Sequence, residues 1–121
     1  MNSGFFMPPL PPTEPSILLE TQDSLEIKKI RFEINRIKLP MGIETSFGIV
    51  RHPGAALAVP ITNSGEVILL RQYRFAISRR ILEFPAGTLE KGEEPLPSIQ
   101  RELGEEAGYR ASKWDFLGQM T

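Results

Sequence analysis

Three glutamates near the C-terminal end of the sequence have the type and spacing that metal-assisted chemistry requires. Glu102, Glu105 and Glu106 are spaced i, i+3 and i+4, which would place their carboxylates on one face of a helix, one turn apart. Like charges in this arrangement repel, at about 0.2–0.5 kcal/mol per pair in an isolated helix. A divalent cation such as magnesium prefers oxygen ligands and bridges carboxylates to substrate phosphates. The spacing therefore indicates phosphate chemistry, with a solvated acidic helix face as the alternative.

The composition excludes several other kinds of site. The 121 residues include 14 Lys+Arg, 15 Asp+Glu, one histidine (His52) and no cysteine, so any metal must be held by oxygen rather than by thiolates or an imidazole cluster. A net charge of -1 gives no electrostatic footprint for nucleic acid. No apolar run of about 18 residues could cross a bilayer, and the N-terminus lacks the features of a secretory signal. We therefore expect a small soluble cytoplasmic protein with neither nucleic-acid nor membrane partners.

The N-terminal part of the chain divides into a tail and a β region. Five prolines within residues 1–16 favour a flexible, extended tail. Residues 17–52 are expected to form strands, because apolar and polar residues alternate from Ile30 to Asn35 and would place the apolar side chains on one face. Ile43 to Arg51 is a further expected strand. The basic residues of this region are expected to form a solvated face.

The sequence of the second half of the chain predicts the strands and the helix that position the three glutamates. The run Ala55–Ile61 and the run Val67–Leu70 flank a turn at residues 63–66, which predicts a hairpin. Another short apolar run covers residues 81–84. A helix is expected from Glu94 to Gly108, with a proline in its first turn and a glycine just past its end. Residues 114–121 are expected to begin another strand.

Seven residues of this segment fit one continuous array, G-x5-E-x7-R-E-U-x-E-E-x-G-U, in which U is apolar. They are Gly87, Glu93, Arg101, Glu102, Glu105, Glu106 and Gly108, with Leu103 and Tyr109 at the U positions. This array resembles the Nudix box without any departure. Gly87 permits a tight loop, and Arg101, one turn before Glu105, can fix that carboxylate by charge-assisted hydrogen bonding.

The resemblance to Nudix hydrolases implies a fold and a metal site. The implied fold is α/β, with a mixed β-sheet between α-helices. Glu102 and Glu106 would be the principal metal ligands, and Glu105 a further ligand or a supporting acid. Glu93 would orient Arg101. The implied cofactor is magnesium, with manganese as an alternative ion.

Two segments upstream of the box resemble the ADP-ribose pyrophosphatase branch of that family. They are Arg71-Gln72-Tyr73-Arg74 and Leu82-Glu83-Phe84-Pro85-Ala86-Gly87. The resemblance implies that Arg74 contacts substrate phosphate and that the Ala86 backbone carbonyl completes a metal site. For Glu83 it leaves open whether the side chain orients the loop, contacts substrate or makes a structural hydrogen bond. Residues 17–52 are similar in layout to the region through which that branch forms homodimers.

The implied function is magnesium-dependent hydrolysis of a nucleoside diphosphate linked to another moiety, with ADP-ribose giving AMP and ribose 5-phosphate. The alternatives are a nucleotide-sugar or other nucleoside-diphosphate pyrophosphatase and a non-catalytic nucleotide-sensing module. That branch carries a Ser-Pro-Gly marker and a catalytic acid beyond the box, and neither occurs before Thr121. We therefore expect residues 53–121 to be an incomplete Nudix hydrolase domain whose general base lies beyond Thr121.

Overall fold

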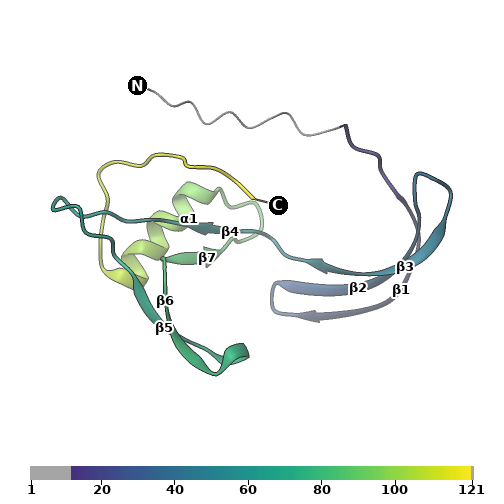
Figure 1. The fold of residues 1–121 in the computed structure, drawn as a ribbon, viewed down its shortest axis with the longest axis horizontal. Helices are drawn as coiled ribbons and strands as arrows, with labels where there is room; N and C mark the ends of the chain where they lie inside the picture. The colour runs from purple at the N-terminus through teal and green to yellow at the C-terminus, as the bar shows by residue number, and fades with distance from the viewer. Residues whose placement is uncertain (1–11, 121) are drawn as a thin grey trace. The chain divides into compact units, whose positions relative to one another are not determined.

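The computed structural model of the chain describes residues 12–120, which divide into two compact units on either side of the His52–Pro53 bond (Figure 1). Most of the expected N-terminal tail, residues 1–11, lies outside the described residues. Residues 12–16 have no regular secondary structure. No helix among residues 12–120 has the length and apolar character needed to span a membrane.

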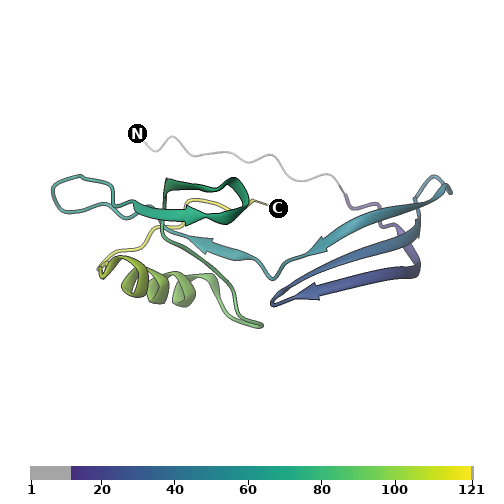
Figure 2. The ribbon, with the colours of Figure 1, turned by 90° about the horizontal axis from the view of Figure 1, so that it is seen from below.

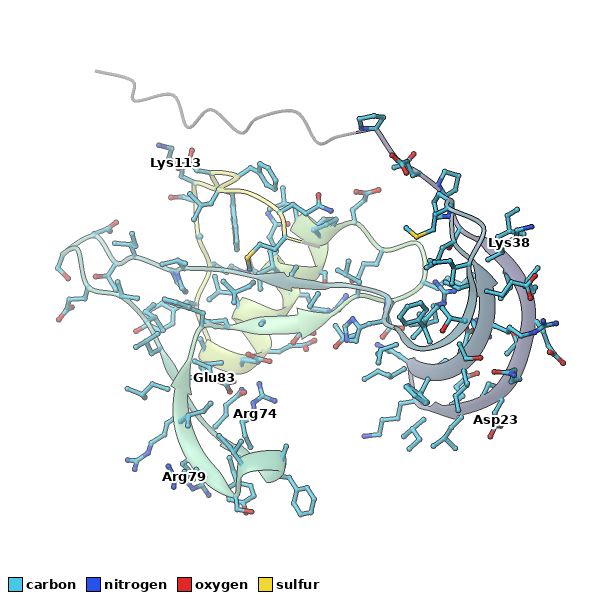
Figure 3. All side chains as sticks on the ribbon, turned by 45° about the vertical axis from the view of Figure 1, so that its right-hand side comes forward. Asp23, Lys38, Arg74, Arg79, Glu83 and Lys113 are labelled. Carbon is cyan, nitrogen blue, oxygen red and sulfur yellow. The ribbon has the colours of Figure 1, made fainter. Side chains whose placement is uncertain are left out.

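The first unit is an antiparallel sheet of three strands in the order β1–β2–β3. Their bounds are Ile17–Ile27, Ile30–Lys38 and Glu44–Arg51. Lys28 adopts a positive φ of 56° in the tight turn between β1 and β2. Two irregularities in the register interrupt β1 between Leu18 and Asp23, and the sheet is visibly curled (Figure 3). The expected strand at Ile43–Arg51 is confirmed to within one residue.

The buried positions of β2 lie on its polar face. Glu33 and Asn35 are 7% and 1% exposed, respectively. The Glu33 carboxylate lies 2.7 Å from Arg31 and 3.1 Å from Arg51, and it accepts a 2.9 Å hydrogen bond from Asn35. That hydrogen bond is the main reason that the pKa of Glu33 lies below its ordinary value. The apolar face is open, with Ile30, Phe32 and Ile34 all at least 36% exposed.

The second unit combines two strand pairs with one helix (Figure 2). Strands β4 and β7 pair antiparallel, as do β5 and β6, and a short 3-10 turn, Phe75–Ile77, joins the latter two. The bounds of the strands are Ala55–Leu57 (β4), Leu70–Arg74 (β5), Arg79–Glu83 (β6) and Ala86–Thr88 (β7). Helix α1, Pro95–Glu102, packs against β4 and β7. The hydrophobic core of the second unit contains Ala56, Ala58 and Ile99, with Leu89 and Trp114 packed against them.

The predicted turn at residues 63–66 is confirmed, whereas the strands around it are shorter than expected. The Thr62 N–H donates to the Glu66 carbonyl at 2.8 Å, and Gly65 has a φ of 83°. Among the described residues between β4 and β5, the expected hairpin is reduced to one isolated antiparallel bridge, which joins Ile61 to Val67. The expected strand from Trp114 onward is wrong, because residues 114–120 have no regular structure and pair with no strand among the described residues.

The helix begins where the sequence predicted and changes its geometry before it ends. Pro95 occupies the first turn, where its missing N–H costs no hydrogen bond. After Glu102 the chain continues as a π-turn, Leu103–Ala107. Gly108 then adopts a φ of 72° and donates to the Gly104 carbonyl at 3.1 Å, which closes the helical segment. The first residue of the π-turn, Leu103, is only 2% exposed, so its buried side chain anchors the start of the turn in the protein interior.

Candidate active site

The structure joins Glu93, which precedes α1, to Arg101, which lies in its last turn. Arg101 Nη1 donates a short hydrogen bond to Glu93 Oε1, while Glu93 Oε2 accepts a 2.9 Å hydrogen bond from the Glu90 backbone N–H. The bond to Arg101 is the main reason that the pKa of Glu93 is lowered and that the pKa of Arg101 is raised. The ion pair ties the loop before the helix to the helix end.

Arg101 also lies between two of the box glutamates. Its Nη2 is 3.5 Å from Glu102 Oε1, and its Nε is 4.0 Å from Glu105 Oε1. Both separations are too long for strong hydrogen bonds. The Glu105 side chain is 63% exposed and the Glu102 side chain 19% exposed. Glu105 therefore lies on the solvent side of Arg101, whereas Glu102 lies on the protein side.

Glu102 and Glu106 lie close enough to affect each other's charge. The pKa of Glu106 is raised, first because the carboxylate is desolvated by burial and second because Glu102 is negatively charged. The backbone of Ala86 lies close enough to the Glu106 carboxylate to offset part of this rise in pKa, yet Glu106 Oε2 is buried without a hydrogen-bond partner among the described residues. Gly87 provides the room for this pair, because a Cβ there would lie 2.5 Å from Cγ and Cδ of Glu102.

A divalent ion fits this pair better than it fits three converging glutamates. Within residues 12–120, no group of three or more Asp, Glu or His side chains is arranged to hold a metal ion. The hydrogen bonds of a π-turn close wider rings than those of an α-turn, so spacing alone does not keep Glu105 beside Glu102 and Glu106. Magnesium needs one or two carboxylates and fills its other positions with water and substrate phosphates. The unpartnered, buried oxygen of Glu106 suits this role.

The β5–β6 hairpin brings the positive charge of Arg74 near Glu106. Arg74 Nε donates to both oxygens of Glu83, at 2.9 and 2.8 Å, and Figure 3 shows the two labelled side chains close together. The positive charge of Arg74 also acts on Glu106, where it offsets part of the rise in pKa. Arg74, Glu83, Ala86 and Glu106 therefore lie near one another. For Glu83, the structure shows a hydrogen-bonding role toward Arg74.

One neighbour of Arg74 was quoted in the upstream segment but was given no role from the sequence. Gln72 accepts a 3.2 Å hydrogen bond from Arg74 Nη2. The signal that could have found it is the two-residue period of a strand, which places Gln72 and Arg74 on one face of β5.

Comparison with known proteins identifies the family. A model of the NUDIX domain matches residues 51–121. The methanol dehydrogenase activator of Bacillus methanolicus is 36% identical over 99 residues, 82% of this chain and 54% of the relative. The ADP-ribose pyrophosphatase of Bacillus subtilis is 44% identical over 86 residues, 71% of this chain and 46% of the relative. The chain spans about half the length of these curated relatives.

A solved structure supports the same fold. The crystal structure of an ADP compounds hydrolase matches 81% of this chain and 54% of its own, with a TM-score of 0.68 and 24% sequence identity. The Nudix fold expected from the box is therefore confirmed. Because the domain model covers more than half of the chain, this protein belongs to the NUDIX domain family.

Proposed function

We propose that this protein hydrolyses the diphosphate of ADP-ribose to AMP and ribose 5-phosphate with the help of magnesium. The observation that carries the proposal is the carboxylate pair of Glu102 and Glu106, in which one buried Glu106 oxygen has no hydrogen-bond partner among the described residues, near the guanidinium of Arg74. A guanidinium binds phosphate oxygens, and a pair of carboxylates binds the divalent cation that accompanies a diphosphate. The site therefore combines the two groups that a nucleoside diphosphate needs.

Each side chain has a distinct task in this proposal. Glu102 and Glu106 would hold magnesium, or manganese in its place, and Ala86 would support Glu106 through the backbone and offer its carbonyl to the ion. When bound, the metal would supply Lewis acidity and a water of lowered pKa. Arg74 would bind the diphosphate, oriented by Glu83. Glu105 would serve as a further ligand or a supporting acid on the solvent side.

The Glu93–Arg101 pair would act on the helix rather than on the substrate. Arg101 is bound by Glu93 and lies next to both Glu102 and Glu105. Its charge would orient these carboxylates for the metal. The general base is not among the residues that this proposal assigns.

The choice of ADP-ribose is supported by the name of the Bacillus subtilis relative and by the upstream segments that resemble the same branch. The alternatives are another nucleoside-diphosphate pyrophosphatase and a nucleotide-sensing module. We also propose that residues 17–52 form a dimerisation region and residues 53–121 the Nudix hydrolase domain. The open apolar face of β2 supports pairing with a second copy of the chain. The cytoplasmic location stays a prediction from the sequence.

Substrate choice is tested with the purified full chain. We expect kcat/KM to be higher for ADP-ribose than for ADP-glucose or a nucleoside triphosphate, with AMP release that stops when magnesium is chelated. Arg74→Ala should lower kcat/KM about tenfold to hundredfold, because hydrogen bonds to charged groups contribute about 1.5–3 kcal/mol. Arg80→Ala is the matched control, since Arg80 pairs with Tyr73 on the other face of the hairpin. A preference for another substrate, or an equal loss in Arg80→Ala, would contradict the proposal.

A further inference from the structure

The guanidinium of Arg74 is held along one of its edges. Its Nε–H donates to both oxygens of Glu83, and Nη2 donates to the side-chain oxygen of Gln72 at 3.2 Å. A guanidinium carries five N–H donors in one plane. These contacts use the Nε proton and one Nη2 proton, and no hydrogen bond within residues 12–120 uses Nη1. Three donors at the outer end of the group are left to bind an anion.

Gln72 and Glu83 reach Arg74 from different strands. Gln72 precedes Arg74 by two residues on β5, while Glu83 lies on β6 opposite Leu70. The pair with Glu83 is half-exposed, and an exposed ion pair by itself restrains the partners weakly. Because the Glu83 contacts share the Nε–H, they leave the guanidinium plane free to tilt. A contact at Nη2 removes this freedom, since two bonds to different nitrogens define the plane.

We infer that Gln72 is a positioning residue that fixes the plane of the Arg74 guanidinium, so that Nη1 and the outer proton of Nη2 face a bound diphosphate. The nature of the anion rests on the proposed function, whereas the contact between Gln72 and Arg74 does not. In this role Gln72 acts through Arg74 and touches no part of the substrate.

The test replaces Gln72 with methionine, which has a similar length and no oxygen to accept the hydrogen bond. ADP with magnesium serves as a diphosphate probe, and its Kd for the full chain is measured by calorimetry. We expect Gln72→Met to weaken ADP binding about threefold to tenfold, the effect of one partly exposed hydrogen bond to a charged group. Gln100→Met, the same substitution on an exposed position of α1, should leave the Kd unchanged.

A double substitution separates positioning from general damage. In an Arg74→Lys background there is no guanidinium plane to fix, so adding Gln72→Met should cause no further loss of ADP affinity. An equal loss in both backgrounds would overturn the inference.

A second measurement requires no ligand. Without the Gln72 contact at Nη2, the guanidinium should tilt and its Nε–H bond to Glu83 should open more often. The Nε–H resonance of Arg74, identified by its absence in Arg74→Lys, should therefore exchange with solvent faster in Gln72→Met and at an unchanged rate in Gln100→Met. If Gln72→Met leaves the exchange rate unchanged, the inference about Gln72 is overturned while the proposed function is not affected. If the unsubstituted chain fails to bind ADP, the proposed function is overturned, and the exchange measurement still decides whether Gln72 holds Arg74.

Discussion

Glu106→Gln should make the metal-free protein more stable and remove most of its response to magnesium. The substitution keeps the shape of the side chain and removes a charge that burial and Glu102 both disfavour. A carboxyl whose pKa is raised by folding costs stability at neutral pH, and that cost disappears as the pH falls through the raised pKa. The gain from Glu106→Gln should therefore be largest at neutral pH and shrink in acid.

The size of both effects follows from the geometry. Relief of the repulsion between two glutamates spaced i, i+4 contributes about 0.2–0.5 kcal/mol, which corresponds to a rise in Tm of about 1–4 °C for a small domain. Magnesium at about ten times its Kd should stabilise the unsubstituted protein by about 1.4 kcal/mol, or roughly 6–11 °C. If loss of one of the two carboxylates weakens the metal about tenfold, that gain falls to about 0.4 kcal/mol.

Thermal unfolding of the two proteins, with chelator and with magnesium, measures these changes directly. Glu94→Gln is the matched control, because Glu94 is exposed before α1 and its side chain makes no capping hydrogen bond. The control should keep the full magnesium response. The reasoning is refuted if Glu106→Gln lowers the Tm of the metal-free protein, or if its magnesium response equals that of Glu94→Gln.

Two further predictions concern the groups around this pair. Gly87→Ala should keep the fold but displace Glu102, since the added Cβ would lie 2.5 Å from its side chain, and titration should show weaker magnesium binding. Gly104→Ala meets no atom within 4 Å and should leave magnesium binding unchanged. Glu93→Gln should destabilise the protein above the ordinary glutamate pKa, because that carboxylate has a lowered pKa through Arg101. Denaturation across a pH series should show the deficit vanishing as the pH falls through the lowered pKa, and a constant deficit would contradict it.

The sequence predicted local features best where one residue type has a single strong conformational preference. Gly108 in a left-handed conformation and Pro95 in the first helical turn are examples, since few other residues suit these positions. The expected strand at Trp114 failed because pairing depends on a neighbouring strand, which no local pattern reports. The buried face of β2 could not be predicted for a related reason. Alternation identified its two faces, but the choice of the buried one depended on contacts of Glu33 with Arg51, 18 residues away.

The candidate site shows the same division between spacing and geometry. The spacing of the box glutamates assumes an unbroken α-helix, and the π-turn after Glu102 departs from it where the acids lie. Spacing alone could indicate that Glu102, Glu105 and Glu106 share a short segment, whereas only the family resemblance singled out Glu102 and Glu106. Spacing does not report which two face each other. That depends on Gly87, which leaves space for Glu102, and on the Ala86 backbone, which lies beside the Glu106 carboxylate. Strand β7 therefore selects the pair, and substitutions in that strand should alter metal binding as strongly as substitutions in the helix.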